Sequence, residues 1–313
     1  MGPGTDGILL IDKCAGETSH DVVKRIRRVL RGAGRAKVGH AGTLDPFATG
    51  LLVVLVGQGT KLSRFIMQGE KTYLATLRLG VETDTLDLEG RVVSMCPVPD
   101  VSLTWVQKVA GRFVGRLQQT PPVYSAVRCR GKRAYELARK GQQVELKARE
   151  VTIRGVEILS MALPDIRFCV RCSSGTYVRR LASDLGKALG SGAHLRSLRR
   201  VESGAFSVMN ALCSAEIGDG IYCASLLKRI IPLREALPGM KEIQISEHTA
   251  EKVRQGRPPA WEDLVLGAGG DPGDLSGRWI KLVSRGRLAA IIQVQAADKG
   301  PCGTISIERV FLS

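Results

Sequence analysis

One uninterrupted aliphatic run constrains the fold of this chain more than any other feature of its sequence. Residues Leu51–Val56 read Leu-Leu-Val-Val-Leu-Val and end at Gly57. A run without polar alternation is typical of a strand that is buried on both faces. It is far shorter than the roughly 20 residues that a membrane-spanning helix needs. We therefore expect a central strand in a covered sheet and no membrane segment.

Further strands and helices are predicted around this run, but they do not alternate regularly as parallel βαβ units require. The expected strands are Gly7–Lys13, Thr72–Leu79, Val151–Ile158 and Ile166–Cys172. The expected helices are Val22–Arg31, Leu103–Val114, Ala134–Lys140 and Val178–Leu189. The pattern favours an α+β fold with a mixed sheet.

A second unit is expected after Ile231-Pro232. Strands are predicted at Arg278–Val283, Leu288–Val294 and Thr304–Leu312, which indicates a small β-barrel module of roughly 75 residues. We expect one domain over residues 1–233 and a smaller one over residues 234–313.

Positive charge is concentrated in the first of these domains. The chain has 46 Lys and Arg against 30 Asp and Glu, a net charge of +16. Residues 1–233 hold 35 of the basic and 20 of the acidic residues, whereas residues 234–313 are nearly neutral. A field of this size points to a polyanionic partner. A solubilising surface or an acidic membrane face is the alternative explanation.

Two segments carry much of this charge. The helix Val22–Arg31 is apolar on one face and basic on the other, and the acidic partners of an ordinary ion-paired face are missing. Within the basic insertion, residues 124–154, nine Lys and Arg stand against three Glu. The candidates for contact with a nucleic-acid backbone are Arg25, Arg28, Arg130, Lys132 and Arg133.

Several other classes of protein are disfavoured. The first residues lack the basic and apolar pattern of a signal peptide, so the chain is expected to be cytoplasmic, with its eight cysteines reduced. Cys169 and Cys172 form a CxxC on a predicted strand, where they point to opposite faces and cannot share a metal ion. P-loop and dinucleotide fingerprints are missing. We expect no metal and no cofactor.

One loop carries an unusual density of reactive side chains. The segment Gly39–Gly50 places His40, Thr43 and Asp45 between glycines, directly before the aliphatic run. Loops mounted on a rigid strand are frequent places for catalysis. Taken alone, Asp45-Pro46 is better explained as the start of a turn.

The full string Val38–Leu52, VGHAGTLDPFATGLL, resembles the catalytic motif of the tRNA pseudouridine synthase B family. Other blocks similar to the family follow in order over about residues 7–210. They are Gly7–Lys13, Lys71–Tyr73, Thr83–Gly90, Gln119–Ala126, Gly131–Tyr135, Ser174–Arg179, Ala193–Leu195 and Leu198–Arg200. The resemblance implies a largely antiparallel sheet flanked by helices, a C-terminal PUA-type RNA-binding domain, and isomerisation of the T-loop uridine of tRNA, conventionally position 55.

The resemblance also implies roles for single residues. Asp45 would be the catalytic aspartate, Tyr73 the proton acceptor against the base, and Arg179 the partner of the aspartate. The implied substrate-binding and supporting residues are His40, Tyr177, Leu198, Lys13 and Lys61. Asp84 and Asp87 are explained as ordinary turn residues. Cys14 replaces a usual proline and Ala41 a usual Thr or Gly, which alters loop geometry but removes no reacting group.

These residue types suit the implied reaction, which breaks the N1–C1′ bond of uridine and forms a C5–C1′ bond. A carboxylate can attack or stabilise the electron-poor carbon, and a neighbouring guanidinium is expected to lower its pKa. The uridine has to leave its stack, and the partner is expected to be the T-arm of tRNA, bound by a monomer. The alternatives are a guide-RNA-dependent enzyme acting on ribosomal RNA and a tRNA-folding chaperone without catalysis.

Overall fold

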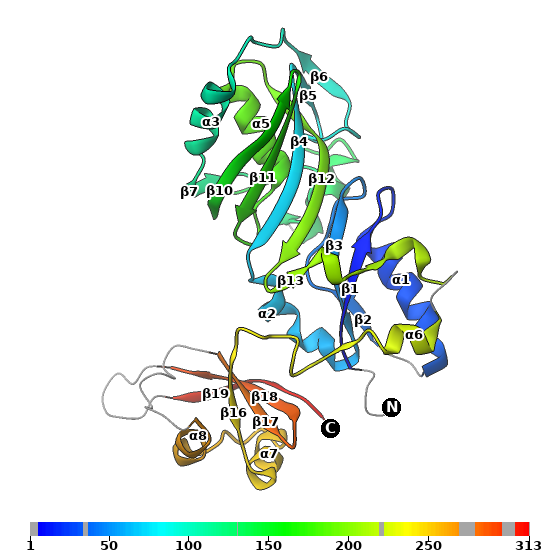
Figure 1. Ribbon diagram of the computed structural model, residues 1–313, viewed down its shortest axis with the longest axis vertical. Coiled ribbons are helices and arrows are strands. Elements are labelled where there is room, and N and C mark those ends of the chain that lie inside the picture. Colours follow the sequence, from blue (N-terminus) through cyan, green and yellow to red (C-terminus); the bar gives the residue numbers. More distant parts are fainter. Residues whose placement is uncertain are drawn as a thin grey trace.

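A computed structural model describes residues 6–33, 37–129, 131–218, 222–268, 279–295 and 304–312 of the chain. The main body is built on one large sheet, and a smaller sheet lies at the C-terminal end (Figure 1). The described strands of the main sheet run in the order β14-β1-β3-β12-β4-β11-β10-β7, with β2, β13 and β15 pairing at its side. All described pairings in it are antiparallel except β1 with β14 and β3 with β12. The predicted mixed, largely antiparallel α+β fold is confirmed.

The bounds of the main-sheet strands follow. They are β1 (Gly7–Lys13), β2 (Val38–His40), β3 (Thr49–Val56), β4 (Lys71–Leu79), β7 (Gly115–Gln119), β10 (Arg149–Ala162), β11 (Asp165–Cys172), β12 (Ala193–Ser203), β13 (Phe206–Ser207), β14 (Leu212–Cys213) and β15 (Ile231–Pro232). Two short hairpins stand apart from it: β5 (Val81–Thr83) with β6 (Val92–Met95), and β8 (Arg128–Cys129) with β9 (Lys132–Arg133).

The helices of the main body are short and cover its faces. They are α1 (Ser19–Val29), α2 (Ser63–Met67), α3 (Leu103–Gly111), α4 (Ala134–Ala138), α5 (Val178–Ala188) and α6 (Cys223–Leu227). Single 3₁₀ turns lie at Leu30–Ala33, Gly57–Leu62, Val208–Asn210 and Ser214–Glu216. Each predicted helix is present, and α1 begins at Ser19 because Thr18 and Asp21 form a reciprocal capping box.

Strand β3 explains why the aliphatic run has no alternation. Leu51, Val53 and Leu55 join one buried cluster, in which they pack with Leu62 and Phe65. The intervening Leu52, Val54 and Val56 join a second cluster on the other face, with Val22 and Ile26 of α1. The strand is therefore covered on both faces, as its sequence predicts. A third cluster joins α5 and α3 to β4, β11 and β12.

The small C-terminal β domain is confirmed, and its described strands form an open sheet rather than a closed barrel. Its elements are β16 (Lys241–Gln244), α7 (Glu247–Arg254), α8 (Trp261–Ala268), β17 (Trp279–Ser284), β18 (Arg287–Val294) and β19 (Ile305–Val310). The strand order is β16-β17-β18-β19, and sequence analysis missed β16 because it is only four residues long. No helix in the described parts of the chain is long and apolar enough to cross a membrane.

The two sheets share an apolar contact. The ring of Trp279 meets Phe65 of α2 edge to face, with 4.9 Å between the ring centres. Leu288, Ile291 and Phe311 are buried in the same cluster as Phe65. Pro232 pairs with β1 of the main sheet, whereas Lys241 is the first residue of β16 in the C-terminal sheet. This is consistent with a boundary after residue 233, which stays a prediction.

Candidate active site

A pocket of about 390 Å³ opens where the Gly39–Gly50 loop meets the middle of the main sheet. Five of the predicted site residues line it from four different parts of the chain. They are Asp45 from the loop, Tyr73 from β4, Tyr177 and Arg179 at the start of α5, and Leu198 from β12. The fold thus brings together residues that lie more than 150 positions apart in the sequence.

In the pocket, Arg179 forms an ion pair with Asp45. Arg179 Nη2 donates to Asp45 Oδ1 at 3.1 Å, and Arg179 Nε lies 3.0 Å from Asp45 Oδ2. The guanidinium thereby faces both oxygens of the carboxylate, a geometry that an ammonium group cannot reproduce. The Arg179 side chain is only 5% exposed and that of Asp45 is 32% exposed, so the carboxylate is the part that a ligand can reach.

Arg179 also bonds to groups other than Asp45, which hold its guanidinium in place. Its Nη1 donates to Asp87 Oδ2 at 3.2 Å and to the Thr85 carbonyl at 2.8 Å, and its Nη2 donates to the Tyr124 carbonyl at 2.9 Å. Asp87 is buried, and Thr85 Oγ1 donates to its second oxygen at 2.6 Å. Asp87 was expected to be an ordinary turn residue. That interpretation is wrong, because its carboxylate orients the guanidinium that meets Asp45.

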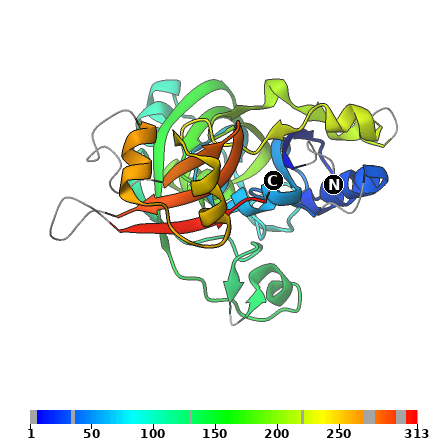
Figure 2. The ribbon, with the colours of Figure 1, turned by 90° about the horizontal axis from the view of Figure 1, so that it is seen from below.

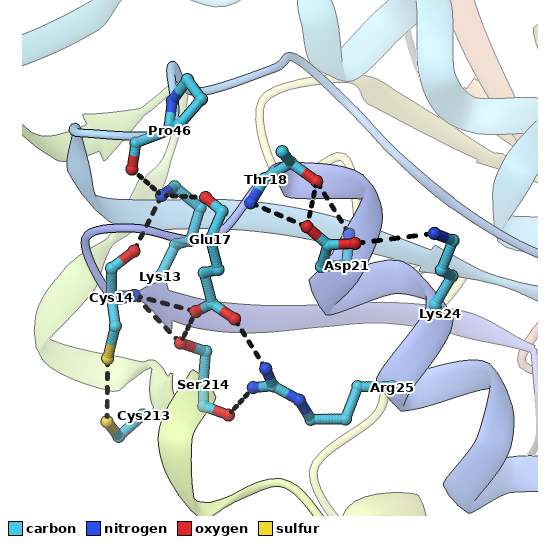
Figure 3. Close-up of polar contacts among 10 residues, drawn as sticks. All are labelled: Lys13, Cys14, Glu17, Thr18, Asp21, Lys24, Arg25, Pro46, Cys213 and Ser214. Atoms are coloured by element: carbon cyan, nitrogen blue, oxygen red, sulfur yellow. Dashed lines mark hydrogen bonds and ion pairs between the residues drawn. The ribbon is translucent and has the colours of Figure 1, made fainter. Parts of the chain in front are cut away.

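The backbone on either side of Asp45 is fixed by buried donors. Ser19 Oγ accepts from Leu44 N at 2.9 Å and donates to Leu44 O at 3.2 Å. On the other side, Pro46 O accepts from Lys13 Nζ at 3.1 Å and from Gly16 N at 3.0 Å, the first of which is drawn in Figure 3. Asp45 therefore sits between two anchored residues, which preorganises its carboxylate.

Arg200 of β12 also supports the Gly39–Gly50 loop, and the sequence alone indicated no role for it. It is 2% exposed and donates to three backbone carbonyls, those of Leu51, Gly42 and Thr43, at 2.7, 3.1 and 3.4 Å. Gly50 permits this close approach, since its φ is +100° and a Cβ there would lie 2.2 Å from the Arg200 carbonyl. Arg200 is thus a structural cation that ties the Gly39–Gly50 loop to the sheet.

Burial changes the acidity of the groups in the pocket. Desolvation raises the pKa of Asp45, and the nearby Asp87 adds to the rise, although Arg179 acts in the opposite direction. The expected net lowering by Arg179 is therefore wrong, because burial outweighs it. Burial likewise raises the pKa of Tyr73, against a smaller lowering by Arg200. At neutral pH the Tyr73 phenol keeps its proton.

Tyr177 has a well-defined place at the pocket wall. Gln119 brackets its backbone, accepting from Tyr177 N at 2.8 Å and donating to Tyr177 O at 3.2 Å. The guanidinium of Arg149 stacks 4.8 Å from the centre of the Tyr177 ring. Arg149 also lines the pocket and was missed as a site residue, because a single Arg in a basic segment carries no distinguishing signal.

Three of the predicted substrate or supporting residues do not line the pocket. Lys13 lies behind the loop, where its ammonium donates to three backbone carbonyls. His40 lies in β2 opposite Val54, and burial lowers its pKa. Lys61 donates to Val310 O at 2.7 Å and stacks on Phe311, so it joins the C-terminal sheet to the main body and does not support the site.

The five candidates for backbone contact differ in their surroundings. Arg28, Lys132 and Arg133 are exposed, and Arg130 lies outside the described residues. Arg25 is occupied: it donates to Ser214 O at 2.6 Å and to Glu17 Oε2 at 2.8 Å. The acidic partners that seemed to be missing are Glu17, which precedes α1, and Asp21 in its first turn. Figure 2 shows the basic insertion standing away from the main body.

Metal ligation finds no support in this geometry. Cys169 is half-buried and Cys172 is buried on the other face of β11, as predicted. Across the described ranges, no group of three or more His, Cys, Asp or Glu side chains is arranged to hold a metal ion. The groups that the described pocket presents are the accessible carboxylate of Asp45, the oriented guanidinium of Arg179 and the aromatic rings of Tyr73 and Tyr177.

Comparison with known proteins agrees with this geometry. Residues 27–178 match the N-terminal domain of the TruB family pseudouridylate synthases, and residues 179–238 match the tRNA pseudouridylate synthase B C-terminal domain. The chain is 41% identical over 286 residues to tRNA pseudouridine synthase B of Geobacter sulfurreducens, covering 91% of this chain and 92% of that one. It is 39% identical over 314 residues to the protein of the same name from Syntrophus aciditrophicus, covering 98% of both.

The fold also matches solved structures. The crystal structure of a Cbf5-Nop10-Gar1 complex aligns with 98% of this chain and 85% of that chain, with a TM-score of 0.72 and 26% identity. The archaeal box H/ACA sRNP Nop10-Cbf5 complex aligns with a TM-score of 0.70, at 24% identity over 98% and 87% of the two chains. Given these matches over nearly the whole length, the chain belongs to the TruB family of pseudouridylate synthases.

Proposed function

We propose that this protein converts the T-loop uridine of tRNA, conventionally position 55, to pseudouridine, with Asp45 as the catalytic carboxylate. The observation that carries the proposal is the contact of Arg179 with both oxygens of Asp45 at the floor of the pocket. Relatives that carry the name tRNA pseudouridine synthase B, about 40% identical over most of the chain, support tRNA as the substrate.

The pocket supplies what a flipped uridine would need. A volume of about 390 Å³ falls within the ~300–1,000 Å³ usual for small-molecule sites. Tyr73 and Tyr177 offer aromatic faces, and Leu198 closes an apolar side. Extruding a base costs about a few kcal/mol of unstacking. Phosphate contacts from exposed Arg28, Lys132 and Arg133 would offset that cost.

The reaction needs no net transfer of a group to or from the enzyme. Asp45 reacts as the ionised carboxylate, with Arg179 fixing its orientation. After the C5–C1′ bond forms, the proton on C5 leaves. Tyr73 is the proposed acceptor of this proton. Because burial raises the pKa of Tyr73, its phenol starts neutral, and its oxygen would take the C5 proton while its own O–H proton passes to solvent water.

We also propose where the protein acts and what it needs for the reaction. The protein would act in the cytoplasm as a monomer, without a cofactor or a guide RNA, and its C-terminal sheet would be a PUA-like RNA-binding domain. A guide-RNA-dependent enzyme within a multiprotein particle is the second candidate, and the likeness to Cbf5 in a complex with Nop10 and Gar1 favours assembly with other proteins. The closer relatives and the basic insertion favour the stand-alone enzyme.

The decisive experiment uses a tRNA transcript labelled with tritium at C5 of uridine. Wild-type protein alone should release tritium, and replacing only the T-loop uridine should abolish the release. Asp45→Asn removes the ionisable oxygen while keeping the shape, so its rate should fall by about 10³-fold or more while tRNA binding persists. Release that requires added guide RNA, or an Asp45→Asn protein that keeps wild-type rates, would overturn the proposal.

A further inference from the structure

Two cysteines meet behind the catalytic loop, at a point that the proposed reaction does not use. Cys14 Sγ lies 3.8 Å from Cys213 Sγ, as Figure 3 shows. Cys14 follows β1 directly and Cys213 ends β14, and these two strands pair in parallel, with Asp12 opposite Cys213. The two thiols are therefore brought together by the sheet itself.

The surrounding hydrogen bonds hold this arrangement in place. Cys14 N lies 2.9 Å from Ser214 Oγ and 3.2 Å from Glu17 Oε1, with both oxygens as acceptors. Ser214 follows Cys213, so one bond ties the backbone of the first cysteine to the neighbour of the second. In a disulfide the sulfur atoms are only about 2.05 Å apart. The two sulfur atoms therefore have to approach each other by less than about 2 Å to form the bond, while the hydrogen bonds hold the backbone.

Both thiols are also reachable by a small reagent. Cys14 and Cys213 are half-buried, neither sealed in the core nor fully exposed. The Lys13 ammonium donates to the Cys14 carbonyl and the Glu17 carboxylate accepts from Cys14 N, so charges of both signs lie beside this cysteine. Among the described cysteines, no other pair of sulfur atoms is in contact.

We propose that Cys14 and Cys213 form a reversible disulfide by exchange with a small-molecule disulfide such as glutathione disulfide. One thiolate attacks the reagent, forming a mixed disulfide and releasing one molecule of thiol, which takes up the proton. The second thiolate then attacks the mixed disulfide at the protein sulfur and releases a second thiol. The protein loses two electrons and two protons, and the reagent gains them.

The bridge would join segments that are 199 residues apart. Closing so long a loop restricts the unfolded chain, so the oxidised protein should unfold at a temperature higher by a few degrees. The inference concerns a modification site and does not rest on the proposed function, because none of its measurements uses RNA.

The test uses full-length protein with Cys223→Ser as the background. Trypsin leaves Cys14 as the single cysteine of the peptide 14–24, but Cys213 and Cys223 share the peptide 201–228. The background substitution therefore makes the cross-link unambiguous. Reduced protein is incubated with glutathione disulfide, free thiols are alkylated, and the digest is analysed by mass spectrometry without reduction.

We expect a species in which peptide 14–24 is joined to peptide 201–228, with an intact mass about 2 Da below that of the reduced protein. Dithiothreitol should reverse both the cross-link and the rise in unfolding temperature. Adding Cys14→Ser or Cys213→Ser should abolish both effects, and the reduced parent protein controls for folding. Stable glutathione on either cysteine without a cross-link, or preferential bridging to another cysteine, would overturn the proposal.

Discussion

The loop around Asp45 and the basic insertion differ in how they are held. The loop is anchored on both sides of Asp45 by Ser19, Lys13 and Arg200, all buried. The middle of the insertion is a hairpin with two residues in each strand, followed by the five-residue helix α4, and its basic side chains Lys132 and Arg133 are exposed. Residues 149–154 of the insertion belong to β10 of the main sheet. Chemistry on one carbon atom needs a fixed carboxylate, whereas attraction to phosphates needs accessible charge.

The largest effect that would test this contrast is expected at Arg179. Arg179→Lys keeps the positive charge but cannot face both oxygens of Asp45 and also reach Asp87, so the rate of tritium release should fall by about 10²-fold or more. The matched control is Arg180→Lys on the same helix turn, since Arg180 pairs only with Asp184 among the described residues. Equal rates for the two variants would contradict the rigid-site interpretation.

Asp87→Asn should give a smaller loss and a diagnostic change with pH. Misorientation of Arg179 should lower the rate by about ten- to hundredfold. The negative charge of Asp87 raises the pKa of Asp45, so removing it lowers that pKa. Because the ionised form of Asp45 reacts, the acidic limb of the pH–rate profile should move to lower pH. Asp84→Asn, which removes the negative charge that faces Arg91, is the control and should leave the limb in place.

Charge reversal in the insertion should act on binding and leave chemistry alone. Lys132→Glu combined with Arg133→Glu should raise KM for tRNA by about tenfold or more at moderate salt and reduce the salt dependence by about two counterions. The kcat at saturating tRNA should stay near the wild-type value. Lys108→Glu on α3, an exposed cation elsewhere, is the control. A fall in kcat with an unchanged KM would place the insertion in the chemical step instead.

The smallest effects are expected on α1, where two similar arginines have different surroundings. Arg25→Gln removes bonds to Ser214 O and Glu17 and should lower the free energy of unfolding by about 1–3 kcal/mol. Arg28→Gln should leave stability unchanged and raise KM by about two- to threefold, the loss of one phosphate contact. Denaturant unfolding and steady-state kinetics on both proteins separate these results. The reverse pattern would show that Arg25, and not Arg28, meets RNA.

The sequence singled out the loop around Asp45, where glycines, reactive side chains and an aliphatic strand fall within about fifteen positions. The roles of Asp45, Tyr73 and Arg179 came from the resemblance of that string and of later blocks to a known family, because Asp45-Pro46 alone is explained as a turn. Burial of Leu51–Val56 on both faces also follows from the local pattern, since a strand exposed on one side would alternate.

Only the tertiary structure decided which residues support that chemistry. The partnership of Arg179 with Asp87 spans 92 positions and that of Arg200 with Gly42 spans 158, and no periodicity predicts such contacts. Lys61 and Arg25 show the same limit, because the sequence predicts a site-supporting lysine and an RNA-facing arginine, yet both side chains bond within the protein and neither lines the pocket. The sequence determined the reacting groups, while packing between distant segments fixed their orientation, their acidity and their supports.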